Sequence, residues 1–199
     1  QVGGTIMKIE FKHQAEVEFE DEILKKATTD ALTGIANRHY FMSRAREELA
    51  FAKRTNILLG IVMMDLDHFK EVNDTHGHQA GDYVLNQFAH LVNNRIRGED
   101  IFGRYGGEEF VIFMRGDIGP PGAKAFCERI RKVIEEFQFN FSGKDIPVTV
   151  SIGLCLKRGR DVNALEELVE AADKALYRAK QGGRNRVEVS WTETDGPPA

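Results

Sequence analysis

Three carboxylates stand where apolar segments of the chain stop. Asp65 follows an apolar run at residues 56–64, and Glu108 and Glu109 follow a pair of glycines between two shorter apolar segments. A strand end and a neighbouring hairpin can bring such side chains together, and carboxylates that converge repel one another unless a cation lies among them. Hard oxygen ligands grouped in this way suit Mg²⁺ bound together with phosphates. The alternative interpretation of any one of these residues is a solvated acidic turn.

The two glycines, Gly106 and Gly107, separate the apolar segments 101–105 and 110–114. Two strands around paired glycines predict a tight β-hairpin. A turn without side chains permits positive φ and lets a bulky triphosphate approach the backbone closely. Because a Gly-Gly hairpin alone is a weak signal, its weight comes from its combination with the three carboxylates.

The elements that must position these groups alternate along the chain. The run at 56–64 is continuous, which is typical of a central strand covered on both faces. Periodicity predicts further strands and helices as follows: strands at 101–105, 110–114, 147–156 and 186–189, and helices at 36–53, 78–95, 121–137 and 163–180. Single helices alternating with strands, with one hairpin, predict an α+β fold in which a central mixed, mostly antiparallel sheet is flanked by helices.

Composition narrows the function. The chain has 199 residues, of which 42% are hydrophobic, enough for one domain of ordinary size with flanking sequence. Its net charge of −4 provides no broad basic field for a nucleic acid, and no segment approaches the roughly 20 apolar residues that span a bilayer. We therefore expect no nucleic-acid partner and no membrane segment in this piece. Cys127 and Cys155 lack metal-ligand spacing and are expected to be buried free thiols of a reducing cytoplasm.

The segments before and after the predicted domain have different roles. Residues 1–13 are interpreted as a leader, and the loose alternation over 2–11 would also suit the last strand of an upstream sensory domain of the forkhead-associated kind. Residues 14–29 are expected to form a connector helix with a partial apolar seam that includes Ile23 and Leu24. The catalytic domain is expected at 30–190 and a disordered tail at 191–199.

The segment Gly106-Gly107-Glu108-Glu109-Phe110 resembles the signature loop of GGDEF domains, with the accepted glutamate in third place. Four other segments agree with that family in order and spacing: Asp30-Ala31-Leu32-Thr33-Gly34 with Asn37-Arg38, 65–70 with Asn73-Asp74, His76-Gly77-His78 with Gly81-Asp82, and 175–180 with Gly183-Arg184-Asn185. The resemblance covers about residues 28–189. It implies a nucleotidyl-cyclase or palm-like sheet and a diguanylate cyclase, an enzyme that joins two GTP molecules into cyclic di-GMP.

For the catalytic centre, the resemblance implies Mg²⁺ or Mn²⁺ held by the carboxylates of Asp65 and Glu108 and by the backbone carbonyl of Leu66. Glu109 would help with a second metal ion or activate the ribose 3′-hydroxyl, which attacks the α-phosphate of the other GTP and expels pyrophosphate. The metal ions would stabilise charge on the attacking and leaving oxygens. The expected catalytic residues are therefore Asp65, Glu108 and Glu109.

Asn73 and Asp82 match the family's guanine-binding residues. The Asn73 amide would bind the edge of the purine, and the Asp82 carboxylate would accept hydrogen bonds from N1 and the exocyclic amine. Adenine has no N1 proton at that edge, so Asp82 favours GTP over ATP. His78 is expected either to contact the ligand or only to begin its helix.

The triphosphate is expected to contact Lys180 and Arg184, with help from Lys70 and from the backbone amides of the Phe69-Lys70 turn. Cations at these positions would neutralise the phosphates. Without the other motifs, Lys180 and Arg184 would be interpreted as a basic helix end that complements the helix dipole.

A second site is implied by Arg97 and Asp100, which resemble the family's RxxD inhibitory site at its usual distance before Gly106. Arg97 would bind a phosphate and the guanine, and Asp100 would accept hydrogen bonds from the guanine of cyclic di-GMP. Arg129 roughly matches a further basic contact, although Lys124 is a comparable candidate. The alternative interpretation of the Arg97–Asp100 segment is an exposed ion pair at a helix end.

Because each domain would hold one GTP, a symmetric cyclic product requires two domains facing each other, and we expect a homodimer in the bacterial cytoplasm. One alternative is a non-catalytic sensor that binds GTP or cyclic di-GMP, which the intact carboxylates argue against. Others are a cyclic GMP-AMP synthase and a palm-type polymerase. The acidic charge balance disfavours the polymerase.

Overall fold

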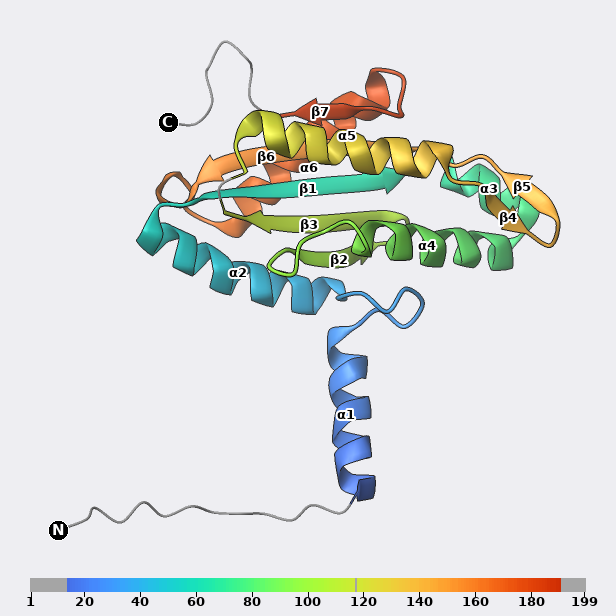
Figure 1. The fold of residues 1–199 in the computed structure, drawn as a ribbon, viewed down its shortest axis with the longest axis horizontal. Helices are drawn as coiled ribbons and strands as arrows, with labels where there is room; N and C mark the ends of the chain where they lie inside the picture. The colour runs from blue at the N-terminus through green and yellow to red at the C-terminus, as the bar shows by residue number, and fades with distance from the viewer. Residues whose placement is uncertain (1–13, 117, 191–199) are drawn as a thin grey trace.

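A five-stranded sheet forms the centre of the domain in the computed structural model, which describes residues 14–116 and 118–190 (Figure 1). Its strands lie in the order β2-β3-β1-β6-β7, with these bounds: β1 (Leu58–Leu66), β2 (Ile101–Gly106), β3 (Glu109–Arg115), β6 (Val150–Arg158) and β7 (Val187–Val189). Neighbouring strands are antiparallel except β6 and β7, which are parallel. The predicted α+β fold class is confirmed.

The central strand is β1, as its apolar sequence predicted, and all nine of its residues are buried. The strand begins and ends two residues later than expected, because Leu66 still pairs with Val150 of β6. Asp65 consequently lies within the paired part of the strand rather than in a loop. A carboxylate held by two neighbouring strands has a fixed position, which a loop residue would not have.

Helices cover both faces of the sheet. The helices α2 (Arg38–Thr55) and α6 (Leu165–Gln181) pack on the face that carries Ile61 and Met63, whereas α4 (His78–Asn93) and α5 (Pro120–Glu136) pack on the face of Val62 and Met64. At Gly153 of β6, a Cβ atom would lie 2.1 Å from the carbonyl oxygen of Ala172, so only glycine lets the backbone of α6 approach the sheet this closely. This contact fixes α6 over β6 and β1.

Three small features were not predicted. The helix α3 (Phe69–His76) lies where the sequence predicted no helix. A hairpin of β4 (Phe139–Phe141) and β5 (Lys144–Ile146) precedes β6. Only Phe69 and Val72 of α3 are buried, too few apolar positions for a periodic signal. A single turn of 3₁₀ helix, η1 (Gly159–Asp161), follows β6. The strand predicted at 147–156 corresponds to β6, which begins three residues and ends two residues later than predicted.

The connector helix α1 (Gln14–Thr28) projects away from the sheet (Figure 1). Its apolar residues Phe19, Ile23 and Leu24 are exposed by 63%, 51% and 61%. The predicted leader at 1–13 and tail at 191–199 lie outside the described residues. Among the helices that the structure describes, none is long and apolar enough to cross a membrane.

Both cysteines are buried and free, as predicted: Cys127 on α5 and Cys155 on β6. Burial raises the pKa of both thiols, because a thiolate is poorly solvated in an apolar interior. Neither thiol is therefore reactive at neutral pH.

Candidate active site

The candidate site lies at the end of β1 where three strands present polar residues. Asp65 of β1 is directly opposite Glu109 of β3 on one side and Ser151 of β6 on the other. Residues directly opposite each other in an antiparallel pair project from the same face of the sheet. Asp65 and Glu109 therefore share the face of the sheet that α6 covers.

Lys180, in the last turn of α6, ends beside Asp65. Its Nζ atom lies 2.8 Å from Oδ2 of Asp65, whose side chain is only 9% exposed. Burial raises the pKa of Asp65 to about 6, because the Lys180 ammonium, which favours the ionised carboxylate, does not offset the loss of solvation together with the smaller repulsion from Glu108 and Glu109. The sequence predicted both residues in the site, but their direct contact was not expected.

These residues fit a divalent cation. Asp65 is a largely buried carboxylate, and Glu108 and Glu109 are near enough to repel it, so these oxygen atoms form a group of the kind that binds a divalent cation. In the part of the chain that the structure describes, no three carboxylate, histidine or cysteine side chains already converge as a metal cage. Lys180 occupies one side of Asp65 instead, and the phosphates of a nucleotide would supply further oxygen ligands.

The hairpin turn before Glu109 is held by Arg104 of β2. The Arg104 guanidinium donates to the carbonyl of Gly107 from Nε at 2.9 Å and from Nη2 at 2.7 Å. Gly107 has a φ of +48°, the region that glycine tolerates best. The turn that carries Glu108 therefore depends on Arg104, which the sequence did not single out.

Arg104 also joins the turn to the start of the domain. Its Nη1 atom lies 3.1 Å from Oδ1 of Asp30, which also accepts hydrogen bonds from the backbone N–H and hydroxyl of Thr33. Burial opposes ionisation of Asp30, but the Thr33 donors and the Arg104 guanidinium outweigh it and lower the pKa of Asp30. The motif that follows the connector helix thus contacts the signature hairpin through one arginine.

Replacing Arg104 should misplace the hairpin while leaving the fold intact. We expect Arg104→Met to lower the rate of product formation about tenfold, the effect of losing charged hydrogen bonds to one backbone carbonyl. Arg38→Met is the matched control, because the Arg38 guanidinium lies 4.3 Å from the ring centre of Tyr105 and does not touch the turn. Equal rates for the two variants in a steady-state assay would show that Arg104 does not position the hairpin.

The residues expected to bind guanine meet between α3 and α4. A Cβ atom at Gly81 would lie 2.0 Å from Oδ1 of Asn73, so the absence of a side chain at Gly81 gives the Asn73 amide its place. Asp82, the next residue on α4, is exposed, and so is His78 at the start of that helix. The Asn73 amide therefore packs against the backbone of α4 one residue before Asp82.

The expected phosphate-binding groups surround the same end of β1. The Phe69 side chain is buried, so only its backbone N–H is available to a ligand, together with that of Lys70 in the first turn of α3. The Lys70 side chain is exposed, and Arg184 is exposed just beyond the end of α6. Helix N-terminal N–H groups and cations of this kind favour phosphate.

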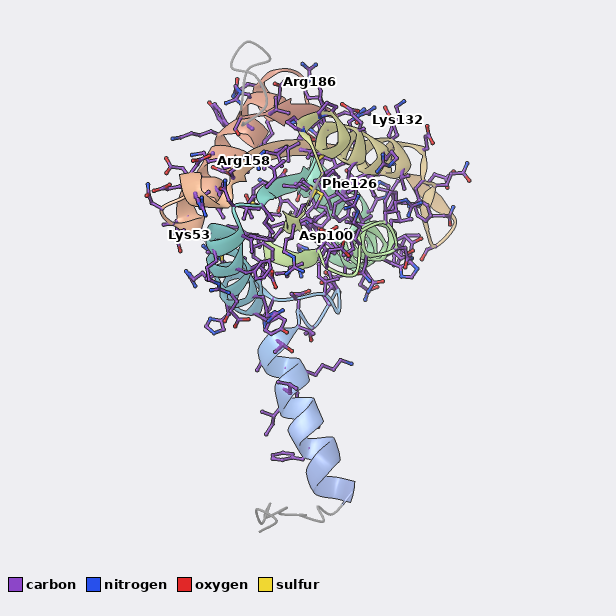
Figure 2. All side chains as sticks on the ribbon, turned by 60° about the vertical axis from the view of Figure 1, so that its left-hand side comes forward. Lys53, Asp100, Phe126, Lys132, Arg158 and Arg186 are labelled. Carbon is purple, nitrogen blue, oxygen red and sulfur yellow. The ribbon has the colours of Figure 1, made fainter. Side chains whose placement is uncertain are left out.

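The RxxD residues are brought together with the proposed third contact. Arg97, Asp100 and Arg129 line one cavity of about 70 Å³, and Figure 2 shows Asp100 beside Phe126 of α5, which lines the same cavity. Arg95 and Arg115 also line it, and the sequence did not predict them. Burial raises the pKa of Asp100, although the backbone N–H of Arg97 donates to its carboxylate at 3.0 Å. Arg115 is paired with Glu48, so the guanidinium groups of Arg95, Arg97 and Arg129 are the ones that make this cavity suitable for an anion.

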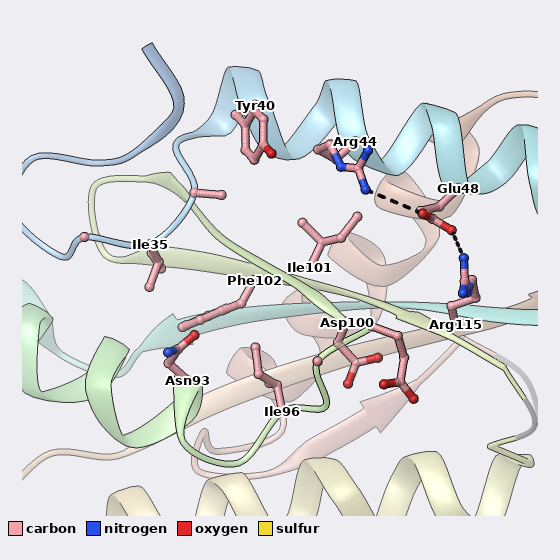
Figure 3. A pocket seen from close by; sticks show the side chains of 14 residues that line it. Ile35, Tyr40, Arg44, Glu48, Asn93, Ile96, Asp100, Ile101, Phe102 and Arg115 are labelled. Carbon is pink, nitrogen blue, oxygen red and sulfur yellow. Dashed lines mark hydrogen bonds and ion pairs between the residues drawn. The ribbon is translucent and has the colours of Figure 1, made fainter. Parts of the chain in front are cut away.

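A larger cavity of about 420 Å³ lies on the other side of the segment 97–100, between α2 and the start of β2 (Figure 3). Its two arginines are neutralised by one carboxylate: Glu48 accepts from Arg115 at 2.5 Å and lies 3.8 Å from Arg44. The two cavities therefore differ in charge, and the smaller one is lined by arginine side chains that Glu48 does not neutralise.

Comparison with known proteins agrees with this geometry. Residues 27–186 match the family described as "Diguanylate cyclase, GGDEF domain". The chain is 42% identical to "Diguanylate cyclase A" of Treponema denticola over 85% of this chain and 46% of that protein. It is 40% identical to "Diguanylate cyclase DgcP" of Pseudomonas aeruginosa over 83% of this chain and 24% of that protein. The chain thus spans about half or less of the length of these two relatives.

Solved structures share the fold. The coiled coil and GGDEF domain of DgcB from Caulobacter crescentus, in complex with c-di-GMP, superposes with a TM-score of 0.81 at 31% identity over 88% of this chain and 94% of that one. The diguanylate cyclase SiaD from Pseudomonas aeruginosa, in complex with its activator SiaC, gives a TM-score of 0.78 at 31% identity over 88% of this chain and 66% of that one.

Proposed function

The chain belongs to the GGDEF family of diguanylate cyclase domains, and on that premise we propose that it condenses two GTP molecules into cyclic di-GMP and releases pyrophosphate. The observation that carries the proposal is the pairing of Asp65 with Glu109 across β1 and β3, with Lys180 2.8 Å from Asp65. Carboxylates and a cation at one strand end suit a reaction in which a hydroxyl attacks a phosphate. The domain would work in the bacterial cytoplasm, where GTP is made.

Each residue has a separate task in the proposed reaction. The Asp65 and Glu108 carboxylates and the Leu66 carbonyl would hold Mg²⁺ or Mn²⁺, which neutralises charge on the α-phosphate when bound. Glu109 would take the proton of the ribose 3′-hydroxyl. Lys180, Arg184 and Lys70 would neutralise the charge of the phosphates. The backbone N–H groups of Phe69 and Lys70 would orient the phosphates by donating hydrogen bonds to them.

Divalent cations provide the first test of this proposal. We expect pyrophosphate release from GTP to require added Mg²⁺ or Mn²⁺ and to stop when a chelator removes the metal. The measurement is a coupled pyrophosphate assay across a Mg²⁺ titration with GTP held constant. Equal pyrophosphate release in excess chelator would contradict the assignment of Asp65 and Glu108 as metal ligands.

A homodimer is the proposed active form, because one domain presents one guanine site between α3 and α4. Phe19 and Ile23 lie one helical turn apart on α1 and are exposed, as a coiled-coil seam would be in a single chain. One of the structures similar to this chain also contains a coiled coil and a GGDEF domain. We propose that two copies of α1 pair and bring the catalytic domains face to face.

Ile23→Asp should separate the subunits by placing a charge in this seam. We expect a monomer by light scattering and a rate per subunit at least about tenfold lower at sub-micromolar protein, since the second GTP is then seldom in place. Activity should recover as the protein concentration rises. Lys25→Asp introduces the same residue away from the seam and should stay dimeric; a dimeric, fully active Ile23→Asp variant would contradict the role of α1.

Product feedback is proposed at the cavity formed by Arg97, Asp100 and Arg129. We expect Arg97→Ala and Arg129→Ala to raise the cyclic di-GMP concentration needed for half-inhibition about tenfold or more, because each removes a charged hydrogen-bond donor from the cavity. The measurement is a product titration, with the uninhibited rate of each variant as its own reference. Lys132→Ala, an exposed change on α5, is the control. Unchanged inhibition in both arginine variants would refute this site.

A further inference from the structure

A second carboxylate at the end of β1 has no assigned task. Asp67 is 6% exposed and lies two residues beyond Asp65. Its Oδ1 atom accepts a hydrogen bond of 2.6 Å from the Ser151 hydroxyl, and its Oδ2 atom accepts one of 2.7 Å from the Thr149 hydroxyl. The backbone N–H of Asn185 donates to the same Oδ2 atom at 3.0 Å. Asp67 therefore joins β1 and the start of β6 to the segment that follows α6.

That segment has an unfavourable backbone. Gly183, Arg184 and Asn185 have φ values of +110°, +63° and +45° in succession. For residues other than glycine the left-handed region is unfavourable, somewhat less so for asparagine, so two such residues in sequence require compensating contacts. Arg184, the proposed phosphate-binding residue, lies between the two flanking left-handed residues.

The Asn185 side chain provides a second attachment, on α5. Its Oδ1 atom accepts from Nη1 of Arg131 at 2.9 Å, and its Nδ2 atom donates to Glu135 at 2.7 Å. Arg131 is itself held by Glu128 at 2.9 Å and by Glu135 at 2.8 Å. Asn185 is thus fixed through its backbone by Asp67 and through its side chain by α5, directly after Arg184.

We propose that Asp67 is a positioning residue, which holds the 183–185 segment in its left-handed conformation and so directs Arg184 toward the triphosphate. This inference rests on the proposed function, because it assigns Arg184 to phosphate binding. Both carboxylate oxygens of Asp67 are occupied by the hydroxyl groups of Ser151 and Thr149 and by one backbone N–H, so we assign Asp67 no direct contact with the nucleotide. Its contribution to GTP affinity therefore passes through Arg184.

A double-mutant cycle separates positioning from general stabilisation. The probe is α,β-methylene-GTP with Mg²⁺, whose α–β bridge cannot be cleaved, and the measurement is its Kd by calorimetry. We expect Asp67→Ala and Arg184→Ala each to weaken binding about tenfold, the effect of losing one charged hydrogen bond. The double variant should bind no more weakly than Arg184→Ala alone, because the positioning residue has nothing left to position.

Matched variants test the same route. Asp67→Asn keeps an acceptor for the Asn185 N–H and should restore binding to within a few-fold of the unaltered chain. Ser151→Ala removes a hydrogen bond to the other oxygen of Asp67 and should leave the Kd unchanged. If Asp67→Ala does not fold, Arg131→Met removes the second attachment without altering the buried carboxylate. It should weaken binding only when Arg184 is present.

The outcomes distinguish this inference from the function on which it rests. Independent effects, in which the double variant binds about a hundredfold more weakly than the unaltered chain, would overturn the positioning role alone. Equal weakening by Ser151→Ala and Asp67→Ala would overturn it as well, since both would then act through the general stability of the sheet end. If the unaltered chain does not bind the probe, the proposed function fails and the inference fails with it.

Discussion

Asp65→Asn is expected to lower the rate of cyclic di-GMP formation by at least about a thousandfold, a loss typical of removing one central electrostatic group from an active site. The substitution keeps the shape of the side chain but removes the negative charge with which Asp65, together with Glu108, would hold the metal ion. The measurement is the initial rate of product formation under saturating GTP and Mg²⁺. Asp145→Asn, an exposed change on the β4–β5 hairpin, is the control and should keep full activity.

The same substitution should make the protein more stable. The pKa of Asp65 rises to about 6 on folding, so the folded chain holds this proton more tightly than the unfolded chain. The ionised carboxylate consequently costs stability that grows from about pH 4 and is complete above about pH 6. Removing the charge should therefore raise the Tm by about 2–4 °C at neutral pH. An active variant, or an inactive one with a much lower Tm, would contradict the assignment of Asp65, since the second result would indicate damage to the fold.

Asp82→Asn is expected to lower kcat/KM for GTP about a hundredfold, because the carboxylate would lose charged hydrogen bonds to N1–H and to the exocyclic amine of guanine. Asp82 is exposed and directly follows Gly81, against which the Asn73 amide packs, and we propose that the two groups bind one purine edge. Inosine triphosphate tests this directly, since it keeps N1–H and lacks the amine.

The preference for GTP over inosine triphosphate should therefore shrink in the Asp82→Asn variant. The measurement is the ratio of kcat/KM for the two nucleotides in each protein. Gln79→Ala, an exposed change in the same helical turn of α4, should keep the ratio of the unaltered chain. A variant that binds less tightly but keeps the full preference would show that Asp82 does not contact the amine.

The sequence predicted the central sheet because its strands carry strong local signals. The apolar run of β1 and the Gly-Gly hairpin between β2 and β3 each specify an element without distant contacts. Asp65 and Glu109 follow from those elements, since antiparallel pairing places the two carboxylates opposite each other. The helices α2, α4, α5 and α6 were also placed to within about two residues at most ends.

The polar contacts that organise the site could not be predicted from the sequence, because they join residues far apart along the chain. The Arg104 guanidinium reaches Asp30, which is 74 residues away in the sequence, and Asn185 reaches Asp67 across 118 residues. Periodicity reports which face of an element is buried, but it does not report which polar groups meet in the folded chain. Arg95 and Arg115 were missed for the same reason, because the cavity they share with Arg97 exists only in the fold.

The contacts between the end of α1 and the hairpin connect the connector helix to the proposed catalytic centre. The α1 helix ends at Thr28, and Asp30 two residues later binds Arg104, which holds the carbonyl of Gly107. A change in how two α1 helices pair would thus reach the turn that carries Glu108. The Arg104→Met variant interrupts this route at a single residue.

Product identity is the measurement on which the proposed reaction depends. The purified chain would be incubated at high concentration with Mg²⁺ and GTP, ATP or both, beside a Glu109→Gln variant, and the nucleotides identified by mass spectrometry. We predict cyclic di-GMP from GTP, none from ATP, no mixed dinucleotide from the mixture, and no cyclic product from Glu109→Gln. A cyclic GMP-AMP product, or no cyclic product from the unaltered chain at concentrations where weak dimers form, would contradict a GTP-specific diguanylate cyclase.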